Sequence, residues 1–206
     1  MNISHSEMVS TLAKPGDTLV SELTGNKAHL WHMASALMGE ACELLEAYDN
    51  AFATESDVDQ ENLIEELGDS EFYIEGIRQG LGIERVEAVS ADIDPIMLQC
   101  HGYDSIAAIK FTIATGKVFD LIKKYVIYNK ELVQGVPTNP KKQVSVLDIQ
   151  DTLAKMEAVL FTYRLTTGFD YQQTLDANIE KLRERYEGFV YTDQAAQDRA
   201  DKAVAE

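Results

Sequence analysis

Several residue types that mark common protein classes are scarce in this chain of 206 residues. The two cysteines, Cys42 and Cys100, form no spacing typical of a metal site, and we expect two free, buried thiols. No stretch approaches the roughly 18 apolar residues of a membrane span. The first residues, MNISHSEMVS, also lack the basic start and apolar run of a secretory signal. These absences predict a cytoplasmic protein.

Basic residues are scarce as well. The chain has 18 Lys and Arg against 35 Asp and Glu, which gives a net charge of −17. Binding to nucleic acid requires cations against the phosphates, and binding to anionic membranes requires them against the headgroups. The charge therefore argues against both partners and suits a protein that binds metal cations. With 45% apolar residues, the chain has enough material for a hydrophobic core.

Proline and glycine are sparse too, and the spacing of apolar residues is helical almost throughout. We expect helices over about 3–13, 27–50, 60–80, 104–130, 146–166, 170–186 and 192–205. The core candidates of the second and third helices are Leu30, Met33, Leu37, Leu44, Ala47, Leu63, Leu67, Phe72, Ile74 and Ile77. A loop with Gly135, Pro137 and Pro140 follows the fourth helix. The pattern predicts an all-α helical bundle.

Four acidic residues form the most informative pattern. Glu40 and Glu43 are three residues apart in one expected helix, and Glu66 and Asp69 are three apart in the next. Residues three apart lie on the same side of a helix, so each pair projects together. In an antiparallel hairpin the four carboxylates would converge, and their repulsion would favour a cation between them. An all-oxygen set without His or Cys matches Mg²⁺ or Mn²⁺ and does not match zinc.

The same pattern has a plain structural interpretation. The chain is so acidic that an exposed, solvated helix face would also place two acids three residues apart. Glu43 and Glu46 form a second such pair on the same helix. Spacing alone therefore leaves the metal site and the solvated face both open.

Longer stretches resemble the MazG-like branch of the all-α nucleoside triphosphate pyrophosphatases, which carries E-x-x-E, a spacer and E-x-x-D. The matching stretches are GEACELLEAY (39–48) and ENLIEELGDSEFYIEGIRQGLGI (61–83). Three further stretches resemble short phage members of the family: HLWHM (29–33), IKKYVIYNK (122–130) and TLDANIEKLRERYEGFVYTDQAAQDRADKA (174–203). The resemblance implies Mg²⁺-dependent hydrolysis of (deoxy)nucleoside triphosphates to monophosphate and pyrophosphate, in a bacterial or phage-infected cytoplasm. It assigns the metal to Glu40, Glu43, Glu66 and Asp69.

The order of the family motifs predicts two units in tandem, residues 1–98 and 99–206. Short members carry GE-x-x-E, KK-x-x-IYNK, EELGD and NI-x-KL-x-x-RY in one unit. Residues 1–98 keep the acids but have Asp49 and Asn50 at the KK position. At the NI-x-KL position they have DIDPI (92–96), with Pro95 in place of the lysine. Residues 99–206, with an expected tail helix, align with the first unit at offsets of 74 (39 onto 113) and 86 (82 onto 168). In that alignment the four acid positions hold Ala114, Lys117, Thr152 and Lys155.

We expect the two units to form a fused pseudo-dimer with one composite active site. The first unit would supply the metal ligands, and the nucleophile would be a metal-activated water instead of a side chain. The second unit would supply the phosphate and nucleotide contacts, namely Lys123, Lys124, Tyr128, Asn129, Lys130, Asn178, Lys181, Arg185 and Tyr186. Taken alone, these basic residues also fit an exposed face paired with nearby acids, and the tyrosines also fit core packing.

Three residues upstream of Glu40, namely His29, Trp31 and His32, are candidates for contacts with the base or sugar, although core or interface packing is their other use. The expected partners are a nucleoside triphosphate and a second copy of the pseudo-dimer, with neither nucleic acid nor membrane. Two other functions stay open: a catalytically weak or inactive protein that sequesters nucleotides, and an acidic helical interaction protein.

Overall fold

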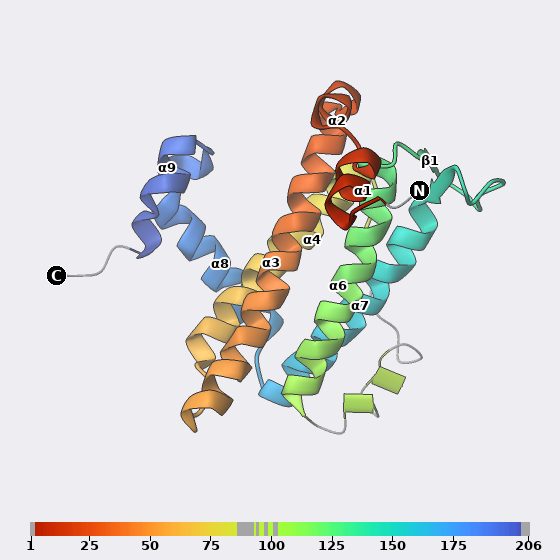
Figure 1. Ribbon diagram of the computed structural model, residues 1–206. Helices are drawn as coiled ribbons and strands as arrows, with labels where there is room; N and C mark the ends of the chain where they lie inside the picture. Colours follow the sequence, from red (N-terminus) through yellow and green to blue (C-terminus); the bar gives the residue numbers. More distant parts are fainter. Residues whose placement is uncertain (1–2, 86–92, 94, 97–98, 101–102, 203–206) are drawn as a thin grey trace.

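The computed structural model describes residues 3–85, 93, 95–96, 99–100 and 103–202, and it confirms the all-α prediction (Figure 1). The bundle consists of four long helices: α3 (Gly25–Thr54), α4 (Gln60–Leu81), α6 (Asp104–Val126) and α7 (Val146–Thr167). Helix α3 packs against α4 and α6, and α6 packs against α7. Buried residues of all four helices belong to one hydrophobic core. The expected boundary between the units falls beside residue 98, which lies outside the described residues.

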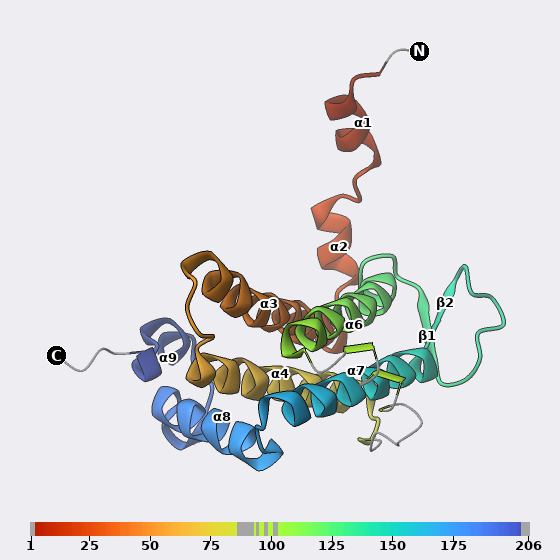
Figure 2. The same ribbon diagram turned by 90° about the horizontal axis from the view of Figure 1, so that it is seen from below.

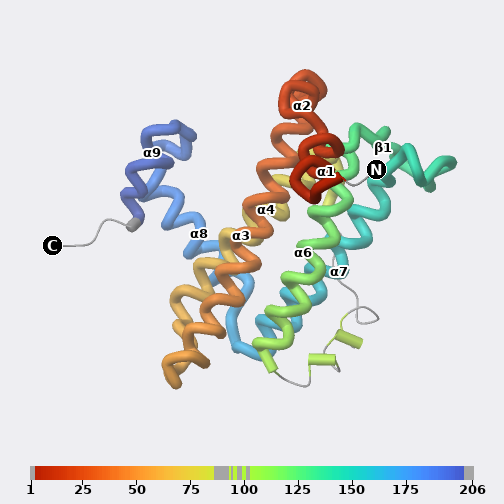
Figure 3. Tube along the Cα trace, viewed as in Figure 1, coloured from red at the N-terminus to blue at the C-terminus, as the bar shows by residue number. Residues whose placement is uncertain are grey.

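Smaller elements surround this bundle. Helix α8 follows α7 and packs against α4, as the trace in Figure 3 shows, and the C-terminal elements pack against α8. Helix α8 spans Tyr171–Arg185. The C-terminal elements that follow it are η1 (Glu187–Phe189), α9 (Asp193–Asp198) and η2 (Ala200–Lys202). At the other terminus, α1 (His5–Leu12) and α2 (Gly16–Glu22) bury no residue and extend away from the bundle in Figure 2.

Helix ends follow the local sequence chemistry. Thr24, Asp59, Ser145 and Asp170 each accept hydrogen bonds from backbone N–H groups of the first helical turn, which would otherwise have no partner. Helices α4 and α7 end at Gly82 and Gly168, both with positive φ (65° and 79°). The expected helix over 192–205 is interrupted, because Arg199 has left-handed backbone geometry and ends α9, while positions 203–205 lie outside the described residues.

The predicted core positions are largely buried, with one clear error. The leucines and isoleucines expected in the cores of α3 and α4 are all buried, and Met33 is as well. Phe72, however, is 48% exposed. It lies two residues before the buried Ile74, and two residues on a helix are separated by about 200°, so the two side chains cannot share a face.

Two short features were not predicted from the sequence. One is helix α2. The other is a pair of parallel strands, β1 (Glu131–Val133) and β2 (Gln143–Ser145), on either side of the expected loop. Three-residue strands are too short to produce a recognisable alternation of apolar and polar residues.

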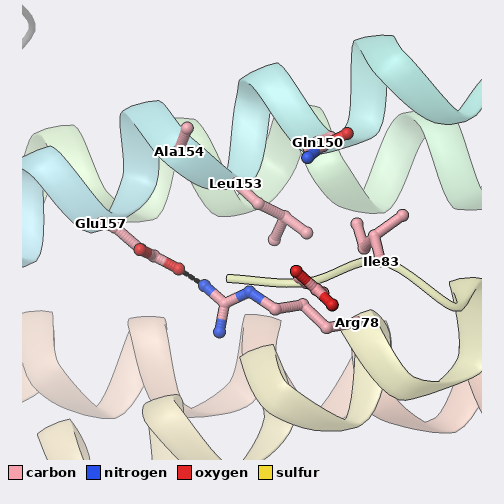
Figure 4. Close-up of a pocket in the computed structure, with 7 residues that line it drawn as sticks. Arg78, Ile83, Gln150, Leu153, Ala154 and Glu157 are labelled. Atoms are coloured by element: carbon pink, nitrogen blue, oxygen red, sulfur yellow. Dashed lines mark ion pairs between the residues drawn. The ribbon is translucent and has the colours of Figure 1, made fainter. Parts of the chain in front are cut away.

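Buried ion pairs join α4 to α7. The Arg164 Nη2 atom donates to Glu71 Oε1 at 2.6 Å, and Arg78 pairs with Glu157 (Figure 4). All four side chains are buried, and the half-exposed Arg85 lies 3.9 Å from Glu71 and 3.4 Å from Glu157. The two pairs are reciprocal, because both glutamates and both arginines are separated by the same 86 positions. Two antiparallel helices related by an approximate two-fold axis would pair in this way.

Breaking one of these pairs should be costly. We expect Glu71→Ala to lower the free energy of unfolding by about 3–5 kcal/mol, because it leaves the buried guanidinium of Arg164 without its carboxylate. The double variant Glu71→Leu with Arg164→Leu should lose much less, because it removes both charges. Denaturant unfolding measures both. As a control, Lys155→Ala breaks an exposed pair with Asp151 and should cost under about 1 kcal/mol. Equal losses in all three variants would contradict the prediction.

Candidate metal centre

The α3–α4 hairpin brings three of the four predicted metal ligands together. One carboxylate oxygen from each of Glu40, Glu43 and Glu66 lies within 4.8 Å of the others. The hairpin is held by buried leucines of the common core on both helices: Leu37, Leu44, Leu63 and Leu67. Since apolar packing fixes the helix positions, the acids are held close in spite of their mutual repulsion.

Glu66 is the most constrained of the three acids. It is 5% exposed, and its Oε2 atom is buried without a hydrogen-bond partner among the described residues. Burial, the hydrogen bond with Glu40 and the nearby carboxylates raise the pKa of Glu66 to about 9. Burial also raises the pKa of Glu40. Glu66 therefore keeps its proton near neutral pH, and its buried oxygen without a partner offers a ligand position for a cation.

Asp69, the fourth predicted ligand, is held by α8. Asn178 Nδ2 donates to Asp69 Oδ1 at 2.6 Å, and the Lys181 ammonium donates to Asp69 Oδ2 and, at 2.8 Å, to Glu65. Burial lowers the pKa of Lys181, but the hydrogen bonds and charges of Asp69 and Glu65 outweigh it, so the net pKa is raised. Lys181 therefore stays charged and neutralises part of the acidic cluster.

A glycine makes this contact between α4 and α8 feasible. A Cβ atom at Gly68 would lie 2.6 Å from the Thr174 carbonyl oxygen and 2.8 Å from the Cβ atom of Asn178. Only a residue without a side chain lets the two backbones approach this closely. Gly68 thus allows α8 to bring Asn178 and Lys181 within reach of Asp69.

The acids line a cavity of about 770 Å³ between α3, α4 and the C-terminal elements. Among the residues predicted from the sequence, its walls contain Glu40, Glu43, Glu66, Asp69, His32, Asn178, Arg185 and Tyr186. The other lining residues were not predicted as site residues: Met33, Asn62, Glu65, Phe72, Tyr73, Leu182, Phe189, Tyr191, Ala196 and Arg199. Phe72 and Tyr73 lie three and four residues after Asp69, and their aromatic character was the one available signal. Burial raises the pKa of Tyr73 to about 12, so its hydroxyl stays neutral.

Other predicted contacts are not brought to this cavity. Lys123 and Lys124 pair with Asp120 at 2.6 Å, and the Lys130 Nζ atom donates to the Pro140 carbonyl. Asn129 accepts from Lys27, and Tyr128 is exposed beside Lys123. None of the five residues predicted over 123–130 is among the lining residues. Their interactions are mainly with neighbours in sequence and with the start of α3.

Two upstream candidates and one cysteine also differ from expectation. His29 Nε2 hydrogen-bonds the Gly76 carbonyl at 2.9 Å, and Trp31 packs on Phe119 with ring centroids 5.1 Å apart. Neither lines the cavity. Of the two free thiols, Cys100 is buried as expected but Cys42 is exposed, because a residue two positions after Glu40 faces the other side of α3.

The donor set fits a hard divalent cation. Its oxygens are all carboxylates, and the described part of the chain places no His or Cys ligand within the cluster. Mg²⁺ and Mn²⁺ prefer such ligands. No family model, curated protein or solved structure matches this chain. In the described ranges, none of the helices is both long and apolar enough to cross a bilayer.

The stability of the metal-free protein should fall with rising pH. Folding raises the pKa of Glu66 from the usual 4.5 to about 9, so the folded state binds a proton that the unfolded state has lost. This contribution is complete below pH 4.5 and disappears as the pH rises towards 9, by at most about 1.4 kcal/mol per unit. In EDTA we expect denaturant unfolding to show this decline, and Glu66→Gln to flatten it. Mg²⁺ should restore stability at pH 8 in the wild type but not in Glu66→Gln. Identical pH profiles of the two proteins would contradict the assignment.

Gly68→Ala tests the contact between α4 and α8. Alanine favours a helix by about 1 kcal/mol over glycine, yet here its Cβ meets backbone and should cost about 1–3 kcal/mol net. Gly39→Ala is the matched control, because a Cβ at Gly39 meets nothing within 4 Å. Thermal melts should show a lower midpoint for Gly68→Ala and an equal or higher midpoint for Gly39→Ala. Stabilisation of both variants would show that α8 does not pack on α4 in this way.

Proposed function

We propose that this chain is a Mg²⁺-dependent nucleoside triphosphate pyrophosphohydrolase of the MazG-like kind, for which Mn²⁺ would also serve. One observation carries the proposal. Glu40, Glu43 and Glu66 place carboxylate oxygens within 4.8 Å of one another on the wall of a large cavity, and one buried oxygen of Glu66 lacks a partner. Packing holds these like charges together, and a divalent cation is the ligand that would relieve their repulsion.

The cavity supports a ligand of nucleotide size. Its volume of about 770 Å³ lies within the range of about 300–1,000 Å³ of small-molecule sites. Carboxylates line one part of the wall, and the exposed side chains of Phe72, Phe189 and Tyr191 line another. Carboxylates suit metal-bound phosphates, and flat aromatic surfaces suit a base.

The reaction is cleavage between the α- and β-phosphates by water. Glu40, Glu43, Glu66 and Asp69 would hold the metal, which supplies charge neutralisation of the triphosphate and a more acidic water. Asn178 and Lys181 orient Asp69 and limit the charge of the cluster. Water forms a new P–O bond, the bond to the bridging oxygen breaks, and pyrophosphate leaves. A carboxylate of the cluster accepts the proton that the water loses.

The tandem arrangement is part of the same proposal. The reciprocal pairs Glu71–Arg164 and Arg78–Glu157 support two related units that face each other. The second unit would contribute to the single site through α8 and the elements that follow it, while the segment over 123–130 serves elsewhere. Pairing of two such chains, and a cytoplasmic location, remain predictions.

A nucleotide-binding protein without turnover is the second candidate. The contact of Lys181 with Asp69 favours this candidate. The ammonium already occupies one oxygen of Asp69, a carboxylate that a catalytic metal would need as a ligand. The two functions differ in product. Hydrolysis releases pyrophosphate and monophosphate, whereas sequestration retains the triphosphate unchanged.

The metal ligands and their counterparts in the second unit should respond differently to mutation. We expect Glu43→Gln and Asp69→Asn each to lower pyrophosphate release by at least about 100-fold, the scale of losing one electrostatic contact in a transition state. Lys117→Ala and Lys155→Ala, both on exposed positions of α6 and α7, should stay within about twofold of wild type. The assay is release of pyrophosphate and monophosphate from the eight common (d)NTPs, with Mg²⁺ and with EDTA.

The results of this assay distinguish hydrolysis from sequestration. Equal loss in all four variants would contradict a single active site on α3 and α4. No release by the wild type from any of the eight substrates, with nucleotide binding retained, would support sequestration. A wild type that gains no thermal stability from Mg²⁺ would contradict metal binding altogether.

A further inference from the structure

The cavity poses an electrostatic problem for a triphosphate. Its lining includes five carboxylates, Glu40, Glu43, Glu65, Glu66 and Asp69. Lys181 donates to two of these acids and is already committed. Among the described lining residues the arginines are Arg185 and Arg199, both from the C-terminal part of the chain. Because phosphate is an anion, these two guanidinium groups are well suited to direct contact with it.

Arg185 is committed to a structural contact. Its Nε and Nη2 atoms both donate to Asp201, each at 2.6 Å, and the Asp201 carboxylate is 2% exposed. The hydrogen bonds to Asp201 raise the pKa of Arg185, while those from Arg185 lower the pKa of Asp201. A two-bond pair of this kind is strong and geometrically specific. It fastens the far end of the segment 186–201 back onto the end of α8.

The fastened segment forms one wall of the cavity. Tyr186, Phe189, Tyr191, Ala196 and Arg199 all line it. The rings of Tyr186 and Tyr191 lie 5.7 Å apart, and Phe189 and Tyr191 are more than half exposed. The wall therefore presents aromatic surface and one arginine towards the space that the metal ligands also face.

Arg199 has the features of a ligand contact. In the described part of the chain its guanidinium makes no hydrogen bond or ion pair, and its charge acts only at longer range on Asp201. A guanidinium without a carboxylate partner, on the wall of an acid-lined cavity, matches the oxygen geometry of a phosphate.

We propose that the segment 186–201 is the phosphate-binding wall of the site, with Arg199 contacting the β- or γ-phosphate and the Arg185–Asp201 pair holding it in place. This inference rests on the proposed function for the identity of the ligand. It assigns the phosphate contact to Arg199, near the C-terminus, in place of Arg185 and the lysines over 123–130. Aromatic side chains on the same wall are then available to stack on the base.

The full-length chain tests this with Arg199→Gln, Arg199→Lys and the control Arg183→Gln. Arg183 is exposed, pairs with Glu180 and is not among the residues that line the acid-lined cavity. For the best of the eight (d)NTPs we expect Arg199→Gln to raise KM about 10- to 100-fold, the worth of one or two charge-assisted hydrogen bonds. Arg199→Lys should fall between. The rise in melting temperature with Mg²⁺ alone should be unchanged in all three. Asp201→Asn should also raise KM, because it releases the wall.

Each outcome decides a separate point. An active wild type with KM for Arg199→Gln within about twofold of its own would overturn the inference and leave the proposed function standing. If the wild type binds a triphosphate with Mg²⁺ in calorimetry but releases no pyrophosphate, hydrolysis is ruled out. Weaker binding by Arg199→Gln in that assay would then support the phosphate contact. Wild-type protein that binds no nucleotide overturns both. Loss of the Mg²⁺ effect in Arg199→Gln would place this residue with the metal and contradict its proposed role.

Discussion

The central constraint in this structure is the repulsion between carboxylates that apolar packing forces together. Leucines on α3 and α4 fix the two helices, and the acidic residues between them have no freedom to separate. The neighbouring structure compensates for the repulsion in two ways. Glu66 keeps a proton because its pKa is raised to about 9, and Lys181 lies against Asp69 and Glu65. Both compensations are replaceable, because a divalent cation would displace the proton and draw Asp69 from the ammonium. In the proposed function, a divalent cation would take over both compensations at once.

The second half of the chain matters because it positions α8. The reciprocal pairs join the C-terminal part of α7 to α4. Tyr171, at the start of α8, lies against the guanidinium groups of Arg85 and Arg164, which are 4.5 and 4.8 Å from the centre of its ring. From there α8 crosses α4 at Gly68, where no side chain intervenes. The buried charges therefore do more than join the two halves. Through Tyr171 they also contact the start of α8, the helix whose Asn178 and Lys181 reach Asp69.

Local sequence was sufficient for the helices and for the acids, and insufficient for their partners. Apolar periodicity and capping residues predicted the long helices within a few residues, and the three-residue spacing placed Glu40 beside Glu43. The contacts of Asp69 join residues more than 100 positions apart, and no local pattern encodes them. The lysines over 123–130 show the opposite error. Their motif suggested a ligand, but Asp120, three and four residues earlier on the same helix, is the partner of two of them. Arg185 likewise pairs with Asp201, which lies 16 positions later in the sequence.

The distribution of charge also determines an order of binding. A cavity lined by five carboxylates disfavours a triphosphate until the carboxylates are neutralised, since both carry the same sign. A divalent cation removes that barrier and supplies ligand positions for phosphate oxygens. The affinities for metal and nucleotide are then thermodynamically coupled, and each must strengthen the other by the same factor. In the proposed function, the cation supplies most of the positive charge, so that this acidic chain needs no basic cleft to bind a polyanion. In the proposed site, Arg199 from the C-terminal part of the lining then adds one direct contact to phosphate, whereas a larger basic patch would compete for the carboxylates that the cation needs.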